Sequence, residues 1–408
     1  MTATVDKSAA ESAVRPFTIE IPQADLEDLR SRIAATRWPE KETVDDQSQG
    51  VPLATMQAVA RYWHDKYDWR RCEAKLNAVP QFVTEIDGLD IHFVHVRSQH
   101  ENALPLVVCH GWPGSFIEQM KIVDLLTNPT AHGGSAADAF HVVIPNMPGY
   151  GFSGKPATSG WDPARIGRAW VTLMKRLGYT KFVAAGGDWG GVVVDVMAGG
   201  RDEPSTPEPA PPELLGIHTN FAGVVPPAID KGAQIGSPIP AGLSDDERRT
   251  AEQLGDLYPY AIGLMMGLRP QTLYGLTDSP VFLAAFILDH DPASQQMITR
   301  AFAGQQEGLS RDDVLDNITL FWLTRTGVSA SRLYWESKFS YVAVKNVTVP
   351  VAVSVFPDEI YQAPRSWAEQ AYPNLIHYNR VERGGHFAAW EQPELYASEL
   401  RAGFRSLR

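Results

Sequence analysis

Cysteine is scarce in this sequence: there are two among 408 residues, Cys72 in a polar segment and Cys109 in an apolar run. Two cysteines in such different settings do not make a disulfide framework, which is what holds small secreted domains together. The sequence therefore argues against a disulfide-rich secreted protein. We expect a reducing compartment, the cytoplasm.

Long apolar runs and long basic runs are also missing. No uninterrupted apolar segment approaches the ~18 residues that a membrane-spanning helix needs. The N-terminal stretch MTATVDKSAAESAVRP lacks the basic and apolar regions of a signal peptide. The formal net charge is -12, and no basic run reaches five residues. Membrane insertion and nucleic-acid binding are therefore not expected, since each depends on a feature that the chain lacks.

The chain does contain enough apolar material for a large core, because 44% of its residues are hydrophobic. Short apolar runs at residues 104–110, 140–146, 181–187 and 214–221 alternate with helix-like segments. Such runs are typical of strands that are buried on both faces of a parallel sheet. We therefore predict an α/β fold with a mostly parallel sheet.

The pattern along the chain predicts four segments. Residues 1–100 form a lead segment of helices followed by a hairpin, whose turn is signalled by Asp87-Gly88. Residues 101–228 and 330–408 form the two parts of the α/β core. Between them, residues 229–329 are helical in pattern and rich in Leu, Met, Phe and Tyr. We expect this insertion to lie over the carboxyl ends of the strands as a cap.

A carboxylate stands at the centre of the sequence GGDWGG. The stretch 186–190 keeps the small residues of a nucleophile elbow, the sharp strand-to-helix turn that lifts one side chain above a sheet, but it carries Asp188 where a serine is usual. Taken alone, Asp188 is better explained as a helix N-cap, because aspartate is common there. A carboxylate nucleophile would form an ester with an alkyl carbon, and water can cleave an ester, whereas serine would leave a stable ether.

A second turn, HGWPGS at residues 110–115, follows the first apolar strand of the core. A turn in this place can present a backbone N–H, here that of Trp112, to a developing oxyanion. The Trp112-Pro113 bond is a candidate for a cis peptide, because X–Pro bonds are where cis peptides occur. The turn therefore predicts an oxyanion hole next to the elbow.

The last strand is followed by RGGHF, which places His386 on a loop after two glycines, a setting that suits a general base. An earlier strand ends at Asp358-Glu359, and either carboxylate could orient the imidazole. The order nucleophile, acid, base along a βα chain favours a catalytic triad over an N-cap and a surface acid pair. We interpret three other histidines as incidental to catalysis: His110, which would brace its turn, His218 and His290.

These residues resemble the epoxide hydrolases of the microsomal type, which have the α/β-hydrolase fold. The resemblance covers nearly the whole chain. The lead segment is especially informative, because serine hydrolases and dehalogenases of the same fold lack it. The motifs that carry the resemblance are RPFTIEIPQADLEDLRSRIAATRWPE, HGWPGSF, PNMPGYGFSGKP, GGDWGG, QTLYGLTDSPV, DNITLFWLT and RGGHFAAWEQPE. Membrane-bound members carry an N-terminal anchor, and we expect a form without one.

The resemblance implies a role for each member of the triad. Asp188 is implied to be the nucleophile and His386 the base. The acid of the family is the fourth residue of an FPxE or FPxD stretch, which makes it Glu359 here and leaves Asp358 the weaker candidate.

Family members also hold the epoxide oxygen with two tyrosines of the cap. SRLYWES matches the second motif and points to Tyr334. The first motif matches less well, because YPYAIGLMMGLRPQTL has two more residues between the tyrosine and Arg269-Pro270 than the family pattern. We choose Tyr260 for this role, and Tyr258 stays open as the alternative.

The predicted reaction converts an epoxide and water to a vicinal diol without a metal or an organic cofactor. The backbone N–H groups of Trp112 and Trp189 would stabilise the oxyanion that forms when water attacks the Asp188 ester. The apolar and aromatic composition of the cap suggests a small hydrophobic epoxide as the substrate. A homodimer is compatible with the sequence. The sequence does not decide which epoxide is used, or whether the role is detoxification or biosynthesis.

Two other functions remain open at this point. A haloalkane or haloacid dehalogenase uses the same aspartate, histidine and acid on the same fold, and Trp112 and Trp189 could be the donors that hold its halide. An idle α/β-hydrolase relative that acts as a binding protein would usually have lost a member of the triad. A serine esterase is excluded by Asp188.

Overall fold

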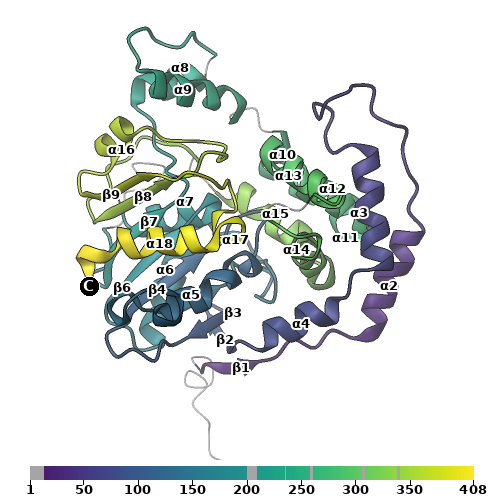
Figure 1. Cartoon of the computed structure of the whole chain (residues 1–408), viewed down its shortest axis with the longest axis horizontal. Helices are drawn as coiled ribbons and strands as arrows, with labels where there is room; N and C mark the ends of the chain where they lie inside the picture. Colours follow the sequence, from purple (N-terminus) through teal and green to yellow (C-terminus); the bar gives the residue numbers. More distant parts are fainter. Residues whose placement is uncertain (1–12, 200–208, 235, 258–260, 306–307, 338–340) are drawn as a thin grey trace, which may run out of the picture.

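A mixed sheet of nine strands lies at the centre of the molecule, in the order β1-β2-β3-β5-β4-β6-β7-β8-β9 (Figure 1). This computed structural model describes residues 13–199, 209–234, 236–257, 261–305, 308–337 and 341–408. The strands are β1 (Arg15–Phe17), β2 (Gln81–Ile86), β3 (Leu89–Val96), β4 (Leu104–Cys109), β5 (Phe140–Pro145), β6 (Phe182–Gly186), β7 (Leu214–Thr219), β8 (Val351–Val355) and β9 (Leu375–Arg380).

The sheet has an antiparallel edge and a parallel remainder. The strands β1, β2, β3 and β5 pair antiparallel, whereas β5, β4, β6, β7, β8 and β9 pair parallel. The predicted hairpin joins β2 and β3, and both of its turn residues, Asp87 and Gly88, have positive φ, as such a turn requires. The predicted α/β class with a mostly parallel sheet is confirmed.

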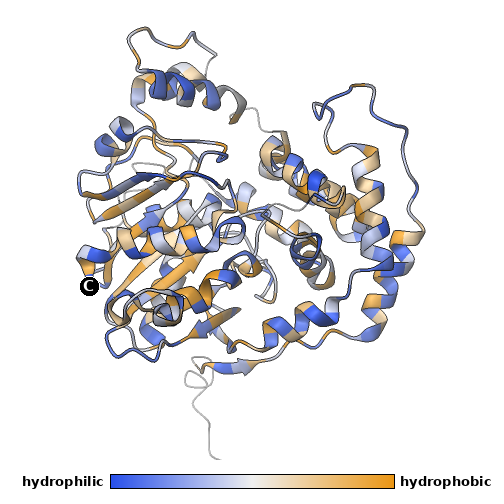
Figure 2. Cartoon of the chain, viewed as in Figure 1, coloured by the Kyte–Doolittle hydropathy of each residue, from blue (hydrophilic) through white to orange (hydrophobic). Residues whose placement is uncertain are grey.

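Apolar residues make the inner strands and bury them on both faces. All five residues of β6 and of β8 are buried, and Figure 2 shows the apolar colour concentrated on the central strands. The helices α5 (Val123–Thr127) and α18 (Pro393–Gly403) lie in front of the sheet in Figure 1, and α6 (Pro163–Arg176) and α7 (Asp188–Met197) lie behind it. The sheet thus offers its carboxyl edge, rather than a face, to a substrate.

A helical insertion separates β7 from β8. Its helices are α8 (Pro227–Gln234), α9 (Asp245–Leu257), α10 (Ala261–Leu268), α11 (Gly275–Asp278), α12 (Pro280–Leu288), α13 (Pro292–Phe302), α14 (Arg311–Thr324) and α15 (Gly327–Glu336). In Figure 1 the helices α10 to α15 form one group beside the sheet, whereas α8 and α9 stand apart, near α16 (Arg365–Ala371). The oxygen Oε1 of Gln253 on α9 accepts a hydrogen bond from the backbone N–H of Gln362 at 3.0 Å, which fixes α9 to the loop after β8.

The lead segment packs on the insertion from outside. It contains α2 (Gln23–Ala34), α3 (Leu53–Asp65) and α4 (Trp69–Asn77). The indole of Trp63 donates to Thr319 Oγ1 at 2.9 Å, and the hydroxyl of Tyr67 donates to Asp316 Oδ1 at 2.8 Å, so both bonds end on α14. The lead segment is therefore part of what holds the cap helices in place. Among the helices of the described ranges, none is both long and apolar enough to cross a membrane.

Candidate active site

The turn between β6 and α7 presents Asp188 at the carboxyl edge of the sheet. Asp188 has a φ of 50°, which is unusual for a residue with a side chain and is the strained backbone of an elbow. The neighbouring glycines make the turn sterically feasible. A Cβ on Gly186 would lie 2.4 Å from the carbonyl carbon of Gly190, and a Cβ on Gly190 would lie 2.3 Å from the backbone oxygen of Cys109. Gly186 and Gly190 are thus required because their backbones approach other backbone atoms too closely for a side chain.

The HGWPGS turn closes over the carboxylate. The N–H of Trp112 donates to Asp188 Oδ1 at 2.6 Å, and a Cβ on Gly111 would lie 2.2 Å from the same oxygen. The predicted cis bond at Trp112-Pro113 is confirmed. The Nε2 of His110 accepts from the N–H of Met147 at 3.1 Å, and this buried ring therefore braces the turn, as interpreted. The turn brings one backbone donor to the carboxylate.

His386 reaches Asp188 from the loop after β9. Its Nε2 lies 3.7 Å from Asp188 Oδ2, and its Nδ1 lies 2.7 Å from Glu359 Oε1. All three side chains are buried. Of the two adjacent acids, the structure brings Glu359 to the imidazole, whereas Asp358 is exposed. The three residues that the sequence singled out for the triad therefore lie in contact or close to contact.

The charges around His386 change its protonation. Burial lowers its pKa, but the charge and the hydrogen bond of Glu359 and the charges of Asp188 and Asp291 raise it, and the net result is a pKa of about 10. At neutral pH His386 is therefore an imidazolium that lies between two carboxylates. Its pKa must fall when the charge of Asp188 is lost, because one of the groups that raises it is then gone.

Aromatic rings form the wall opposite the elbow. Tyr334 on α15 lies with its ring centroid 4.9 Å from that of Trp189 and 5.8 Å from that of Trp112, in edge contact with both. The structure therefore places Tyr334 at the site. Tyr260, and its alternative Tyr258, lie outside the described residues. Trp189 follows Asp188 in the first turn of α7, where helix N–H groups have no partner within the helix.

A second tyrosine, Tyr341, contacts the carboxylate of Asp188, and the sequence analysis missed it. The hydroxyl of Tyr341 donates to Asp188 Oδ2. Burial, followed by the negative charge of Asp188, holds the pKa of Tyr341 well above its usual value, so the hydroxyl keeps its proton. Its ring is stacked with that of Tyr334 at a centroid distance of 6.2 Å. No local motif marks Tyr341, because its place depends on how the chain returns from the cap to the core.

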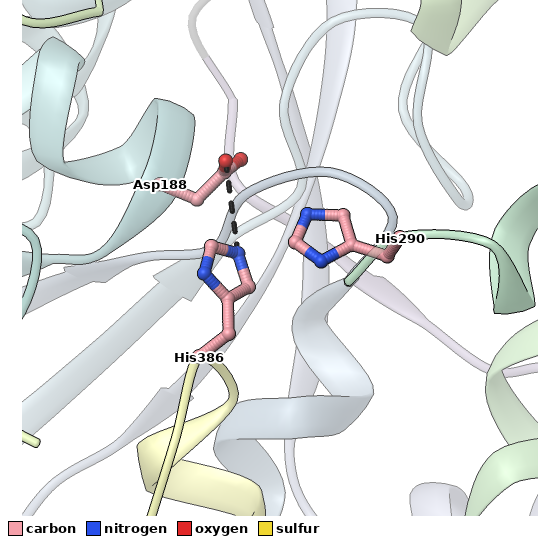
Figure 3. A group of neighbouring side chains, drawn as sticks. All are labelled: Asp188, His290 and His386. Carbon is pink, nitrogen blue, oxygen red and sulfur yellow. Dashed lines mark ion pairs between the residues drawn. The ribbon is translucent and has the colours of Figure 1, made fainter. Parts of the chain in front are cut away.

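The structure places His290, which we interpreted as incidental to catalysis, next to His386. The short link between α12 and α13 carries it to the site, where its ring centroid lies 4.3 Å from that of His386. Its Nδ1 is 2.8 Å from Asp291 Oδ2. Figure 3 shows Asp188, His290 and His386 converging from three parts of the chain. His218, by contrast, is buried away from these residues and bonds Ser354 Oγ at 2.9 Å.

The convergence of His290, His386 and Asp188 raises the question of a metal ion. One ligand-type atom from each residue lies within 4.8 Å of the others. However, the Nδ1 atom of each histidine faces a carboxylate, and each oxygen of Asp188 already accepts a hydrogen bond, from Trp112 or from Tyr341. These contacts account for the arrangement without an ion. We assign no metal ligand here.

Family models match two parts of the chain. Residues 14–119 match the model described as epoxide hydrolase N terminus, and residues 105–204 match the alpha/beta hydrolase fold. A protein of Stigmatella aurantiaca (strain DW4/3-1), which its name provisionally calls an epoxide hydrolase, is 49% identical over 97% of this chain and 86% of its own length. Epoxide hydrolase 1 of Sus scrofa is 34% identical over 97% of this chain and 89% of its own length.

Solved structures give the same result. Juvenile hormone epoxide hydrolase from the silkworm Bombyx mori superimposes with a TM-score of 0.83 at 27% identity and covers 98% of this chain and 97% of its own. The epoxide hydrolase of Aspergillus niger has a TM-score of 0.79 at 27% identity, with 98% of each chain covered. The likeness therefore includes the lead segment and the cap as well as the sheet.

Proposed function

The chain belongs to the epoxide hydrolase family of the α/β-hydrolase fold and hydrolyses an epoxide to a vicinal diol, and we propose that a covalent ester on Asp188 carries this reaction. One observation supports the proposal more than any other. The two oxygens of Asp188 have different surroundings, since Oδ1 accepts the N–H of Trp112 at 2.6 Å while Oδ2 faces His386 at 3.7 Å. Such a carboxylate is ready to become an ester whose carbonyl oxygen already has a donor.

The first step alkylates Asp188. Its Oδ2 attacks one carbon of the epoxide, a carbon–oxygen bond forms, and the ring bond from that carbon to the epoxide oxygen breaks. The released alkoxide takes a proton from Tyr334 or from Tyr260, because a phenol is acidic enough to protonate a strongly basic alkoxide. The imidazolium of His386 supplies the proton that restores the phenol, which leaves a neutral imidazole beside a neutral ester.

The second step hydrolyses the ester. Neutral His386, oriented by Glu359, takes a proton from a water molecule whose oxygen attacks the carbonyl carbon of the ester. The N–H groups of Trp112 and Trp189 stabilise the oxyanion, an effect worth roughly 3 kcal/mol per donor in comparable sites. Collapse of the intermediate expels the alkoxide, which leaves as the diol after it takes the proton from His386. The second proton of the attacking water returns to His386, and the resting ion pair is restored.

We also propose that the substrate is a small hydrophobic epoxide. The ring of Trp112 has edge contacts with Phe286 at 5.7 Å and with Tyr334 at 5.8 Å, so the wall that faces Asp188 is aromatic. We place the enzyme in the cytoplasm, because Cys72 and Cys109 are free and buried thiols rather than a disulfide. A homodimer remains a prediction from the sequence.

Trapping the ester tests the proposal. The variant His386→Gln should keep alkylation and lose hydrolysis. It is incubated with separate panels of aromatic epoxides, aliphatic epoxides and haloalkanes, and its intact mass and peptide map are measured. We expect one adduct of whole-epoxide mass on the peptide that contains Asp188. A matched control is His132→Gln, since His132 lies on the surface and is bonded to Asp124. An alkyl adduct from haloalkanes alone would instead assign the protein to the dehalogenases.

A further inference from the structure

A small polar cavity lies directly beside the proposed nucleophile and base. Its volume is about 20 Å³. About 10–15 Å³ is enough for one water molecule when two to four polar groups can bond it. The carboxyl, imidazole and amide side chains that line the cavity are those of Asp188, His386, Glu118, Gln119 and Asn220. The cavity therefore has the size and the lining of a site for a single water.

Glu118 stands out among these residues. Its carboxyl group is buried, and no cation among the described residues fully compensates for a negative charge there. It lies on the 3-10 helix η1 (Phe116–Ile122), directly after the turn that carries Trp112, and only 7% of its surface is exposed. The carboxyl group of Glu118 fits against the turn only because residue 114 is a glycine: a Cβ on Gly114 would lie 1.8 Å from Glu118 Oε2. The HGWPGS turn thus makes room for a carboxyl group as well as for the oxyanion.

Glu118 is a neutral acid at neutral pH. Burial raises its pKa to about 8, and the charge of Asp188 adds to this effect, while His386 and a hydrogen bond from Gln119 oppose it. A neutral carboxyl group offers both an acceptor oxygen and an O–H donor. Neutral Glu118 can therefore hold a water molecule without adding a negative charge next to Asp188. A negative charge there would destabilise the oxyanion.

Gln119 gives an independent indication of a water molecule. Its amide nitrogen donates to Glu118 Oε1 at 3.0 Å. Its amide oxygen is buried and has no hydrogen-bond partner among the described residues. A buried acceptor in this state usually bonds ordered water. The orphaned oxygen belongs to a residue that lines the cavity, so it supports the same conclusion as the cavity's size.

We propose that Glu118 and Gln119 position the water that hydrolyses the Asp188 ester. The inference rests on the proposed function, because it concerns the second step of that reaction. The water oxygen attacks the ester carbonyl carbon, one of its protons goes to Nε2 of His386, and the other stays in a hydrogen bond to Glu118. Glu118 is thus a positioning residue that does not exchange a proton in this step. Neither Tyr334 nor Tyr341 lines this cavity.

Two variants of Glu118 separate this role from a structural one. Glu118→Leu keeps the size of the side chain and removes its hydrogen bonds, whereas Glu118→Gln keeps a neutral group that donates and accepts. Each variant is mixed with less than one equivalent of an epoxide that the wild type turns over, and the reaction is quenched over time. Intact mass then gives the fraction of Asp188 ester, from which the rates of alkylation and hydrolysis are fitted separately.

We expect the leucine variant to hydrolyse the ester about 10- to 100-fold more slowly, which is the cost of a misplaced reactant. Its alkylation rate should stay within about threefold, and the glutamine variant should recover hydrolysis to within about tenfold of the wild type. If the leucine variant hydrolyses the ester at the wild-type rate, or if both steps slow equally, the inference about Glu118 is wrong. The proposed function would be unaffected by either result. If no variant, including His386→Gln, forms an ester on Asp188, the proposed function fails and the inference fails with it.

Discussion

The two sides of the active site are built in different ways. On the core side the backbone fixes the reacting group: Asp188 sits in a strained turn, and its Oδ1 is held by the N–H of Trp112. On the cap side, the rings of Tyr334 and Tyr341 both pack against the indole of Trp189, and the hydroxyl of Tyr341 also donates to Asp188 Oδ2. The core side therefore tolerates little change, whereas the cap side can be altered one ring at a time. In the proposed mechanism, the bond-forming atoms are therefore fixed, whereas the donors to the epoxide oxygen can be altered.

The substitution Asp188→Asn should have the largest effect, because it removes the reacting atom itself. An amide oxygen is a poor nucleophile for an epoxide carbon, so diol formation should fall by more than about 10⁴-fold. Activity of the purified variant is measured at once and again after days of storage. Slow recovery would indicate hydrolysis of the amide to the acid. A stable asparagine variant with wild-type turnover would contradict the proposed nucleophile.

The substitution Glu359→Gln tests the core side through the charge on His386. Without that carboxylate the imidazole loses its orientation, and kcat should fall by about 10²–10⁴-fold, as for related triads. The stability should change as well. Although burial lowers the pKa of His386, Glu359 and Asp188 raise it to about 10, so the bound proton stabilises the fold below about pH 6.5. That contribution is lost as the pH rises through about 10.

Denaturant titrations at pH 7 and pH 9 measure this linkage. In the wild type, the free energy of unfolding should decrease over this interval, because the unfolded chain releases the proton of His386 and the folded chain keeps it. The glutamine variant should show a smaller decrease. An equal decrease in both proteins would mean that Glu359 does not raise the pKa of His386.

On the cap side, Tyr334→Phe should have an intermediate effect. It removes one proposed donor to the epoxide oxygen and leaves the ring contacts with Trp112 and Trp189 in place. Alkylation should slow by about 10–10²-fold, while hydrolysis of the ester keeps its rate. Single-turnover experiments with mass detection of the ester separate the two steps. A selective loss in the hydrolysis step would contradict the place of Tyr334 in the mechanism.

The smallest effect is expected at Gly255 on α9. A Cβ there would meet no heavy atom within 4 Å, and its φ is not in the left-handed region. Gly255→Ala should therefore raise the free energy of unfolding by about 0.5–1 kcal/mol, the helix preference of alanine, without a change in kcat. Chemical denaturation measures the gain. A loss of turnover would show that α9 is coupled to the chemistry.

Much of the core could be predicted from the sequence because its signals are local. GGDWGG, HGWPGS and RGGHF each lie on one turn after one strand, and the order of strands in an α/β sheet brings such turns to the same edge. The choice between Asp358 and Glu359 depended on the family resemblance, since both end the same strand. The structure places Glu359 next to His386 and leaves Asp358 exposed.

The rest could not be predicted, because it depends on how distant segments pack. Tyr341 and His290 carry no local motif, and each reaches Asp188 or His386 only through the path of the cap helices. Glu118 lies in the segment FIEQMKI, which carries no catalytic motif. Its importance is visible only when the cavity beside His386 is known.

The bonds from Trp63 and Tyr67 to α14 have a consequence for local unfolding. Because the lead segment and α14 share these buried bonds, α14 cannot leave its place unless α3 and the start of α4 lose their contacts too. The two parts should then open as one cooperative unit. In native-state hydrogen exchange, the slowest amides of α3 and α14 should show the same opening free energy and the same denaturant dependence, although more than 200 residues of sequence separate them.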